Sequence, residues 1–100
     1  MIVVRNVFRL KFGKAKDALA LWKEGREIAR RTGSSEKMRA MTDLVGPFYT
    51  LVMEEEFPSL AAMEKEWENE MGAEEWKGWY QKFVPLVDSG YREVFTVVEA

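Results

Sequence analysis

One asparagine interrupts an apolar face near the start of the chain. Residues 2–12 alternate in character as a strand does, and their even positions are apolar except for Asn6. A buried amide needs hydrogen-bond partners, so Asn6 either bonds to nearby backbone or helps to form a small polar site. The helical regions add aromatic rings that could enclose a flat apolar ligand or simply fill the core. These rings are Trp22, Trp67, Trp76, Trp79, Tyr80 and Phe83.

Trp79 is the aromatic candidate for contact with a ligand. It precedes Tyr80 directly, and two adjacent helical residues cannot both point to the centre of one buried stripe. We therefore expect one of the two rings to lie at the rim of the aromatic layer.

The odd positions of the first strand carry cationic candidates for ligand binding. Arg5 and Arg9 project from the face opposite to Asn6, where guanidinium groups could hold a small anion. The alternative is an ion-pair network that fixes strand register, because Glu54 and Glu56 are expected on the same face of a later strand. Both interpretations remain open from the sequence.

The composition excludes several kinds of chemistry. The 100 residues include no cysteine and no histidine, which removes disulfides, thiolate or imidazole zinc sites and His-dependent triads. The run of glutamates over 64–75 alternates along a helix and does not share one face, so no metal site is predicted. A general base would have to be a carboxylate, and Asp43 is a weak candidate. No membrane span or leader is recognisable, and we expect a cytoplasmic protein without membrane contact.

The charges are distributed unevenly. Residues 1–39 hold eleven Lys and Arg against four Asp and Glu, whereas residues 40–100 hold four against thirteen. A basic half could suggest nucleic acid, but no glycine-rich or aromatic RNA-binding signature accompanies it. We expect a basic helix beside an acidic one and no nucleic-acid partner.

The pattern of the chain predicts a single α+β domain over residues 1–100. The expected order is β-α-β-β-α-β, with a second helix broken near Gly72, which is the ferredoxin-like arrangement of one four-stranded antiparallel sheet. Pro85 should kink or end the broken helix, whose stripe extends to Val87, and Ser89-Gly90 is expected to form a turn. The expected strands are 2–12, 37–45, 48–57 and 91–99, with Gly46-Pro47 breaking the chain between the middle two. Helices are expected over 14–32, stopped by Thr32-Gly33-Ser34-Ser35, from Pro58-Ser59 to 71, and from 73.

The first helix should bury one apolar stripe, on which Gly25 suggests close backbone packing against a sheet. The members of the stripe are Ala15, Ala18, Leu21, Trp22, Gly25, Ile28 and Ala29.

The second face of this sheet is too apolar to remain in water. Val3, Val7, Phe48 and Val52 would lie there with two residues of the last strand. A twofold copy that presents the same face would bury this surface. We therefore expect a homodimer that closes into an α+β barrel.

Three segments resemble the dimeric α+β barrel proteins, and within them the NIPSNAP-like and antibiotic-biosynthesis-monooxygenase-like groups. They are residues 7–14 with the Trp22-bearing helix that follows, residues 43–49, and the acidic strand end 54–60. The resemblance extends over essentially the whole chain and implies the fold far more strongly than an activity. Haem-degrading members place an Asn on the first strand and a Trp on the second helix, as Asn6 and Trp67 are placed here. They bind iron through a histidine that this chain lacks, so we expect no cofactor.

Two functions follow. The first is a homodimeric binding or structural module that holds a small hydrophobic or anionic ligand. The alternative, implied by the resemblance, is a cofactor-independent monooxygenase that acts on an aromatic substrate, with Asn6, Trp67, Tyr80 and an arginine lining its pocket. An enzyme needs an open space beside Asn6, whereas a structural protein would fill that space with aromatic rings.

Overall fold

Seven regular elements and a short 3₁₀ turn make up the computed structural model, which describes residues 1–33, 37–71 and 73–99. The order is β-α-β-β-α-α-β, an α+β ferredoxin-like fold in which the second helix is divided in two. Gly72, where the break was predicted, lies outside the described residues, as do Ser34 and Ser35 of the predicted helix stop. The elements are β1 (Ile2–Leu10), α1 (Ala15–Thr32), β2 (Met38–Thr42), β3 (Thr50–Phe57), α2 (Leu60–Met71), α3 (Glu74–Phe83), η1 (Val84–Leu86) and β4 (Val87–Thr96).

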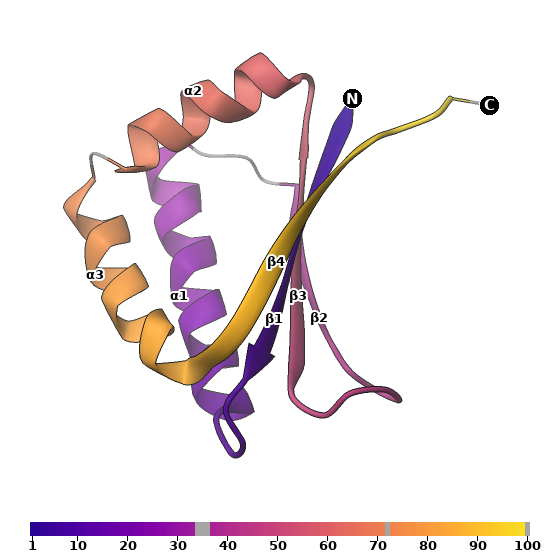
Figure 1. Cartoon of the computed structure of the whole chain (residues 1–100). Coiled ribbons are helices and arrows are strands. Elements are labelled where there is room, and N and C mark those ends of the chain that lie inside the picture. Colours follow the sequence, from indigo (N-terminus) through magenta and orange to yellow (C-terminus); the bar gives the residue numbers. More distant parts are fainter. Residues whose placement is uncertain (34–36, 72, 100) are drawn as a thin grey trace.

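The four strands form one antiparallel sheet in the order β2-β3-β1-β4. All three helices lie on one side of it, which leaves the other face open (Figure 1). Asn6 on the central strand β1 lies opposite Met53 of β3 and Arg92 of β4. Because side chains alternate along a strand, these three residues share the helix-covered face, whereas their neighbours Val7 and Tyr91 share the open one.

The loop between β2 and β3 confirms the predicted break at Gly46-Pro47, although both strands are shorter than predicted. The carboxylate of Asp43 accepts a hydrogen bond from the backbone N–H of Thr50 (2.9 Å), and Asp43 donates its own N–H to the Thr50 carbonyl (3.3 Å). Asp43 therefore closes the base of this loop, which accounts for an aspartate here without a catalytic role.

The prediction for the last strand was wrong at its start. Val87 is not on a helix, and Ser89-Gly90 is not a turn, because β4 begins at Val87 and runs through both residues. Of the two effects expected of Pro85, a kink or an end, the structure shows the end, since Pro85 lies in the 3₁₀ turn η1 directly after α3. Gly90 is needed for a close approach: a Cβ atom there would lie 2.8 Å from the ring of Phe8 and 3.0 Å from the Val7 carbonyl oxygen.

On the helix-covered face, the described residues form two buried apolar clusters, one at each end. The first contains Phe83 of α3 and Leu51 of β3, with Phe8 packed against it. The second contains Val4, Phe57 of β3 and Met63 of α2, with Trp67 packed against it. On β1, Asn6 lies between Val4 and Phe8, so the polar residue falls between the two apolar clusters. The remaining buried members of the first cluster are Leu10, Ala18 and Leu21.

Gly25 provides the close contact between α1 and α3. The sequence predicted that it would pack against the sheet, which was wrong, because the ring of Trp79 covers it instead. A Cβ atom at residue 25 would lie 2.9 Å from Trp79 Nε1. That indole N–H donates to the backbone carbonyl of Leu21, and the ring stacks on Phe83 with centroids 4.9 Å apart. Trp79 therefore holds α1 and α3 together through packing and one hydrogen bond.

Gly25→Ala is expected to lower the free energy of unfolding by about 1–3 kcal/mol, because the new methyl group displaces Trp79 and breaks its partly buried hydrogen bond. Gly78→Ala in α3 is the matched control: nothing lies within 4 Å of its Cβ position. There alanine should stabilise the helix by up to about 1 kcal/mol. Urea unfolding of both variants measures the difference, and equal stability of the two would contradict a structural role for the contact between Gly25 and Trp79.

Candidate functional site

A polar band crosses the helix-covered face of the sheet between the two core clusters. It consists of Glu55 on β3, Asn6 on β1 and Arg92 on β4. Glu55 lies opposite Val4, and Asn6 lies opposite Arg92, so the band runs diagonally across three strands. Polar side chains on a face that is otherwise apolar are more typical of a binding site than of a core.

Asn6, Arg92 and Trp67 form one connected group. Arg92 donates a hydrogen bond from Nε to Oδ1 of Asn6 at 2.7 Å. Its guanidinium lies over the ring of Trp67 from α2, with Cζ 4.4 Å from the ring centroid. Trp67 in turn meets Phe57 edge to face, with the ring centroids 6.4 Å apart. The amide and the indole therefore hold the guanidinium from two sides.

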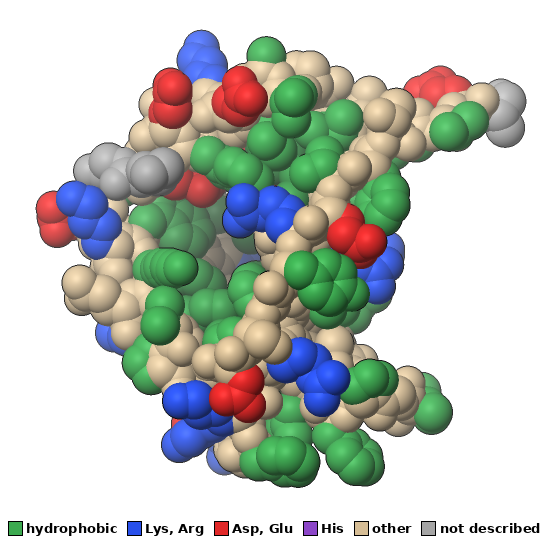
Figure 2. Space-filling view, in the orientation of Figure 1, with side chains coloured by type: hydrophobic (Ala, Val, Ile, Leu, Met, Phe, Trp, Pro, Cys, Tyr) green, Lys and Arg blue, Asp and Glu red, His purple; other side chains and the backbone are tan. Residues whose placement is uncertain are grey.

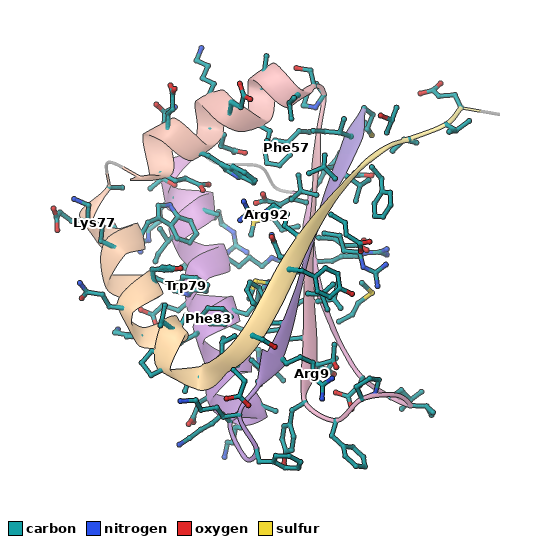
Figure 3. The ribbon with its side chains drawn as sticks, in the orientation of Figure 1. Arg9, Phe57, Lys77, Trp79, Phe83 and Arg92 are labelled. Atoms are coloured by element: carbon teal, nitrogen blue, oxygen red, sulfur yellow. The ribbon has the colours of Figure 1, made fainter. Side chains whose placement is uncertain are left out.

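A hollow opens beside this group, between the helix layer and β4. Figure 2 shows it lined largely by hydrophobic side chains, with a basic group at its edge. Figure 3 places Arg92 there, pointing from β4 into the space below α2, with Phe57 above it and Trp79 and Phe83 towards the other end. The two ends of the space are filled by the core clusters, and Arg92 itself remains exposed. Asn6 therefore lies near an opening and not inside a fully packed core.

The carboxyl group of Glu55 has a strongly shifted pKa. Burial raises the pKa of its carboxyl from 4.5 to about 7, the negative charges of Glu70 and Glu66 on α2 raise it as well, and Arg92 lowers it. A carboxyl with this pKa exchanges its proton near neutral pH, which is the property required of a general acid or base. The same shift is also what a merely buried glutamate would show.

The pKa of Glu55 predicts how stability changes with pH. The folded protein holds this proton more tightly than the unfolded chain, so the free energy of unfolding should fall as the pH rises from 4.5 through about 7. Urea unfolding at pH 5.5 and 8 measures the change. Glu55→Gln, which keeps the shape and cannot ionise, should lose this fall. A wild-type protein whose stability is the same at both pH values would contradict the assignment.

Tyr80 lies apart from the Asn6 group. Its side chain is 54% exposed, beside a shallow depression that Lys77 and Val84 also line. Among the described residues, no hydrogen bond or ring contact joins it to Asn6, Trp67 or Arg92. Trp79, the adjacent candidate, is half-buried in the contact between α1 and α3. The structure thus gives Trp79 a packing role and leaves Tyr80 at the surface.

Arg5 and Arg9 lie on the open face, opposite to the hollow. Arg5 approaches Glu54 at 3.9 Å, and Arg39 of β2 pairs with the same carboxylate at 2.8 Å. Arg9 donates a 3.4 Å hydrogen bond to the carbonyl oxygen of Phe48 in the loop before β3. Glu54 is on the face where it was predicted, and its ion pairs join three neighbouring strands. This geometry corresponds to the ion-pair network that the sequence left as an alternative to an anion site.

Sequence reasoning did not propose Glu55 or Arg92 as a site residue. It expected an arginine in the pocket, but the sequence does not give the register between strands, so the partner of Asn6 could not be identified, although Arg92 lies within the predicted strand 91–99. With Val87 as the first strand residue, Arg92 falls on the same face as Asn6. Glu55 was recognisable as a charged residue between Met53 and Phe57 on an apolar strand face, the same signal that marked Asn6.

Residues 1–33, 37–71 and 73–99 include neither a cluster of metal ligands nor a membrane-spanning helix. Within these ranges no three acidic side chains gather in a way that could hold a metal ion. No helix there has the length and apolar character to cross a membrane.

The fold and the family are defined by comparison with known proteins. The crystal structure of an uncharacterised NIPSNAP domain protein from Burkholderia xenovorans matches with a TM-score of 0.84 at 16% identity, over 98% of this chain and 95% of that one. A NIPSNAP family protein from Agrobacterium tumefaciens strain C58 matches with a TM-score of 0.86 at 17% identity, over 98% and 93%. An antibiotic biosynthesis monooxygenase matches with a TM-score of 0.76 at 19% identity, over 99% and 100%. None of the curated proteins matches the sequence.

These structures establish the class as a ferredoxin-like α+β domain, in agreement with the sheet order and the helices on one face. The NIPSNAP family model matches residues 4–99. The chain therefore belongs to the NIPSNAP family, as the sequence resemblance indicated.

Proposed function

We propose that this chain is a binding module that takes a small molecule with a flat apolar body and an anionic group into the hollow beside β4. The observation that carries the proposal is the Asn6–Arg92–Trp67 group at the edge of an apolar space. A pocket with mostly apolar walls and a few fixed polar groups is the usual form of a small-molecule site.

Arg92 is held in a conformation suited to an anion. Its Nε is occupied by Asn6 and one face of the guanidinium by Trp67, so little side-chain freedom is left to lose on binding. The two terminal nitrogens make no hydrogen bond with any residue that the structure describes. A carboxylate could therefore accept two parallel hydrogen bonds from them, while its apolar body lies along the walls of the hollow.

The test uses 2-naphthoate, which has a flat ring system and one carboxylate, and its uncharged amide as the control. Titration followed by NMR should move the side-chain amide signal of Asn6 and the indole signal of Trp67. The amide should bind more weakly, because it cannot form the charged pair with Arg92. Shifts confined to the depression around Tyr80, or to the open face near Arg9, would refute this location.

A second candidate function is a cofactor-independent monooxygenase that acts on an aromatic substrate. The observation that favours it is the raised pKa of Glu55, which would let its carboxylate accept a phenol proton near neutral pH. Similarity in fold to an antibiotic biosynthesis monooxygenase is consistent with this candidate. Oxygen consumption with electron-rich phenols tests it: turnover that Glu55→Gln abolishes would support the enzyme, and no uptake of oxygen with such phenols would count against it.

The open face of the sheet is proposed to bind a second copy of the chain. Val7 and Val52 lie at its centre and are themselves buried, whereas Tyr91 and Phe95 stand beside them with 60% and 49% of their surface exposed. The same face carries both signs of charge, as in the Arg5–Glu54 pair, so a twofold copy could place unlike charges opposite each other. Apolar rings and paired charges together favour a copy of the same surface as the partner.

Native mass spectrometry of the purified protein tests the dimer. A species at twice the 11.6 kDa mass of the chain is expected. Tyr91→Asp should shift it to the monomer, because the new charge would be buried in the interface. A wild-type monomer at micromolar concentration would contradict the proposal.

A further inference from the structure

We infer that the hollow binds a proton together with its anionic ligand, and that Glu55 is the group that takes up this proton. The inference rests on the proposed anion site at Arg92 and adds a second determinant of specificity. Glu55 would then distinguish carboxylates from neutral compounds through its protonation state, and would tie the affinity for the anion to pH.

The surroundings of Glu55 give it few ways to stabilise a negative charge. Its neighbours in the register are apolar, Val4 on β1 and Met38 on β2. The charged groups that face it from the packed elements are Glu66 and Glu70 on α2 and Arg92 on β4. Among the described residues, Arg92 is thus the one cation that lowers the pKa of Glu55, and its guanidinium is already directed at Asn6 and Trp67.

An anionic ligand changes this balance. A carboxylate bound to Arg92 neutralises the cation that favours ionised Glu55, and it adds a further negative charge to a site that already contains acidic side chains. Repulsion between this charge and ionised Glu55 favours the neutral acid, so Glu55 should then be protonated. As a carboxylic acid it can also donate a hydrogen bond, which the carboxylate form cannot do.

Protonation of Glu55 requires little free energy near neutral pH. Because the pKa of Glu55 is about 7 without ligand, a substantial fraction of the protein already carries the proton at pH 7. Binding of an anion should raise this pKa further, since linkage requires that the proton and the anion stabilise each other's binding equally.

The experiment measures the Kd of 2-naphthoate by calorimetry from pH 6 to 8.5. We expect Kd to weaken by roughly tenfold or more between pH 6.5 and 8.5, as Glu55 loses its proton before the ligand arrives. Calorimetry at pH 8 in two buffers of different ionisation enthalpy should show uptake of nearly one proton for each 2-naphthoate bound. The neutral amide should bind with a Kd that does not depend on pH and without proton uptake.

Two variants localise the effect. Glu55→Gln should bind 2-naphthoate with the same Kd at pH 6 and 8.5 and without proton uptake, because glutamine imitates the protonated acid. Glu64→Gln, at an exposed position on α2, should retain the full pH dependence of the wild type. If Glu55→Gln does not fold, the calorimetric proton uptake of the wild-type protein still shows whether a proton is bound together with 2-naphthoate.

The outcomes separate this inference from the proposed function. Binding of 2-naphthoate with equal affinity at pH 6 and 8.5 and no proton uptake would overturn the role of Glu55 and leave the anion site at Arg92 intact. Proton uptake that persists in Glu55→Gln would also overturn it. A failure of 2-naphthoate to bind at any pH would instead refute the anion site itself, together with the inference that depends on it.

Discussion

Replacement of Phe83 by alanine is expected to lower the free energy of unfolding by about 3–5 kcal/mol, a large part of the stability of a domain of this size. Phe83 is 5% exposed and belongs to the first core cluster. Its ring meets Phe8 of β1 edge to face at 5.0 Å and stacks on Trp79 at 4.9 Å. The variant would lose the buried ring and both aromatic contacts, and it would leave a cavity where α3 rests on the sheet.

Tyr80→Ala is the matched control for this prediction. The two aromatic residues lie three positions apart on α3, but Tyr80 is 54% exposed, so its removal should change the free energy of unfolding by about 0.5 kcal/mol or less. Urea unfolding followed by circular dichroism measures both variants. A loss of similar size in the two would mean that α3 is not anchored through Phe83.

The course of the chain was predictable where local patterns are strong. The alternation in residues 2–12 placed Asn6 on the apolar face, and β1 confirms this. The apolar stripe of α1 was also predicted correctly, since Ala18, Leu21 and Ile28 are all buried. Both patterns arise because one face of each element must be removed from water, a requirement that is written into consecutive residues.

The start of β4 could not be predicted in this way. Ser-Gly is a typical turn sequence, yet Gly90 lies inside a strand because the ring of Phe8 occupies the space that a side chain would need. The reason for this glycine is therefore a residue more than eighty positions away. Gly25 is a similar case: its position on the stripe predicted a close contact, and only the tertiary structure shows that Trp79 makes it.

The same distinction between local pattern and tertiary structure applies to the candidate site. Asn6 and Trp67 were noted from their residue types and their elements, and the structure places them on either side of one guanidinium. The roles of Arg92 and Glu55 depend on register across three strands, which no local pattern gives, although the predicted last strand included Arg92. The perturbed pKa of Glu55 is produced by burial below α2, which no local pattern in the sequence encodes.

The second large effect is expected from Arg92→Gln, which should weaken the binding of 2-naphthoate by about 100-fold. The variant loses the charge and the paired N–H donors, and hydrogen bonds to a charged group contribute about 1.5–3 kcal/mol. Calorimetry at pH 6.5 measures the Kd, and the neutral amide should bind wild type and variant with similar affinity. Stability should change little, since Arg92 is exposed and glutamine can still donate a hydrogen bond to Asn6.

Arg26→Gln separates this effect from a general loss of positive charge. Arg26 also lies over an indole ring, with its Cζ 5.5 Å from the centroid of Trp22, but it belongs to the exposed surface of α1. Its replacement removes the same charge and the same kind of ring contact, so a nonspecific attraction of the anion would weaken equally in both variants. If only Arg92→Gln weakens the binding of 2-naphthoate, then binding depends on the contact with Asn6 and on the apolar hollow, and not on positive charge alone. Those are the two features that distinguish the pair at β4 from the pair on α1.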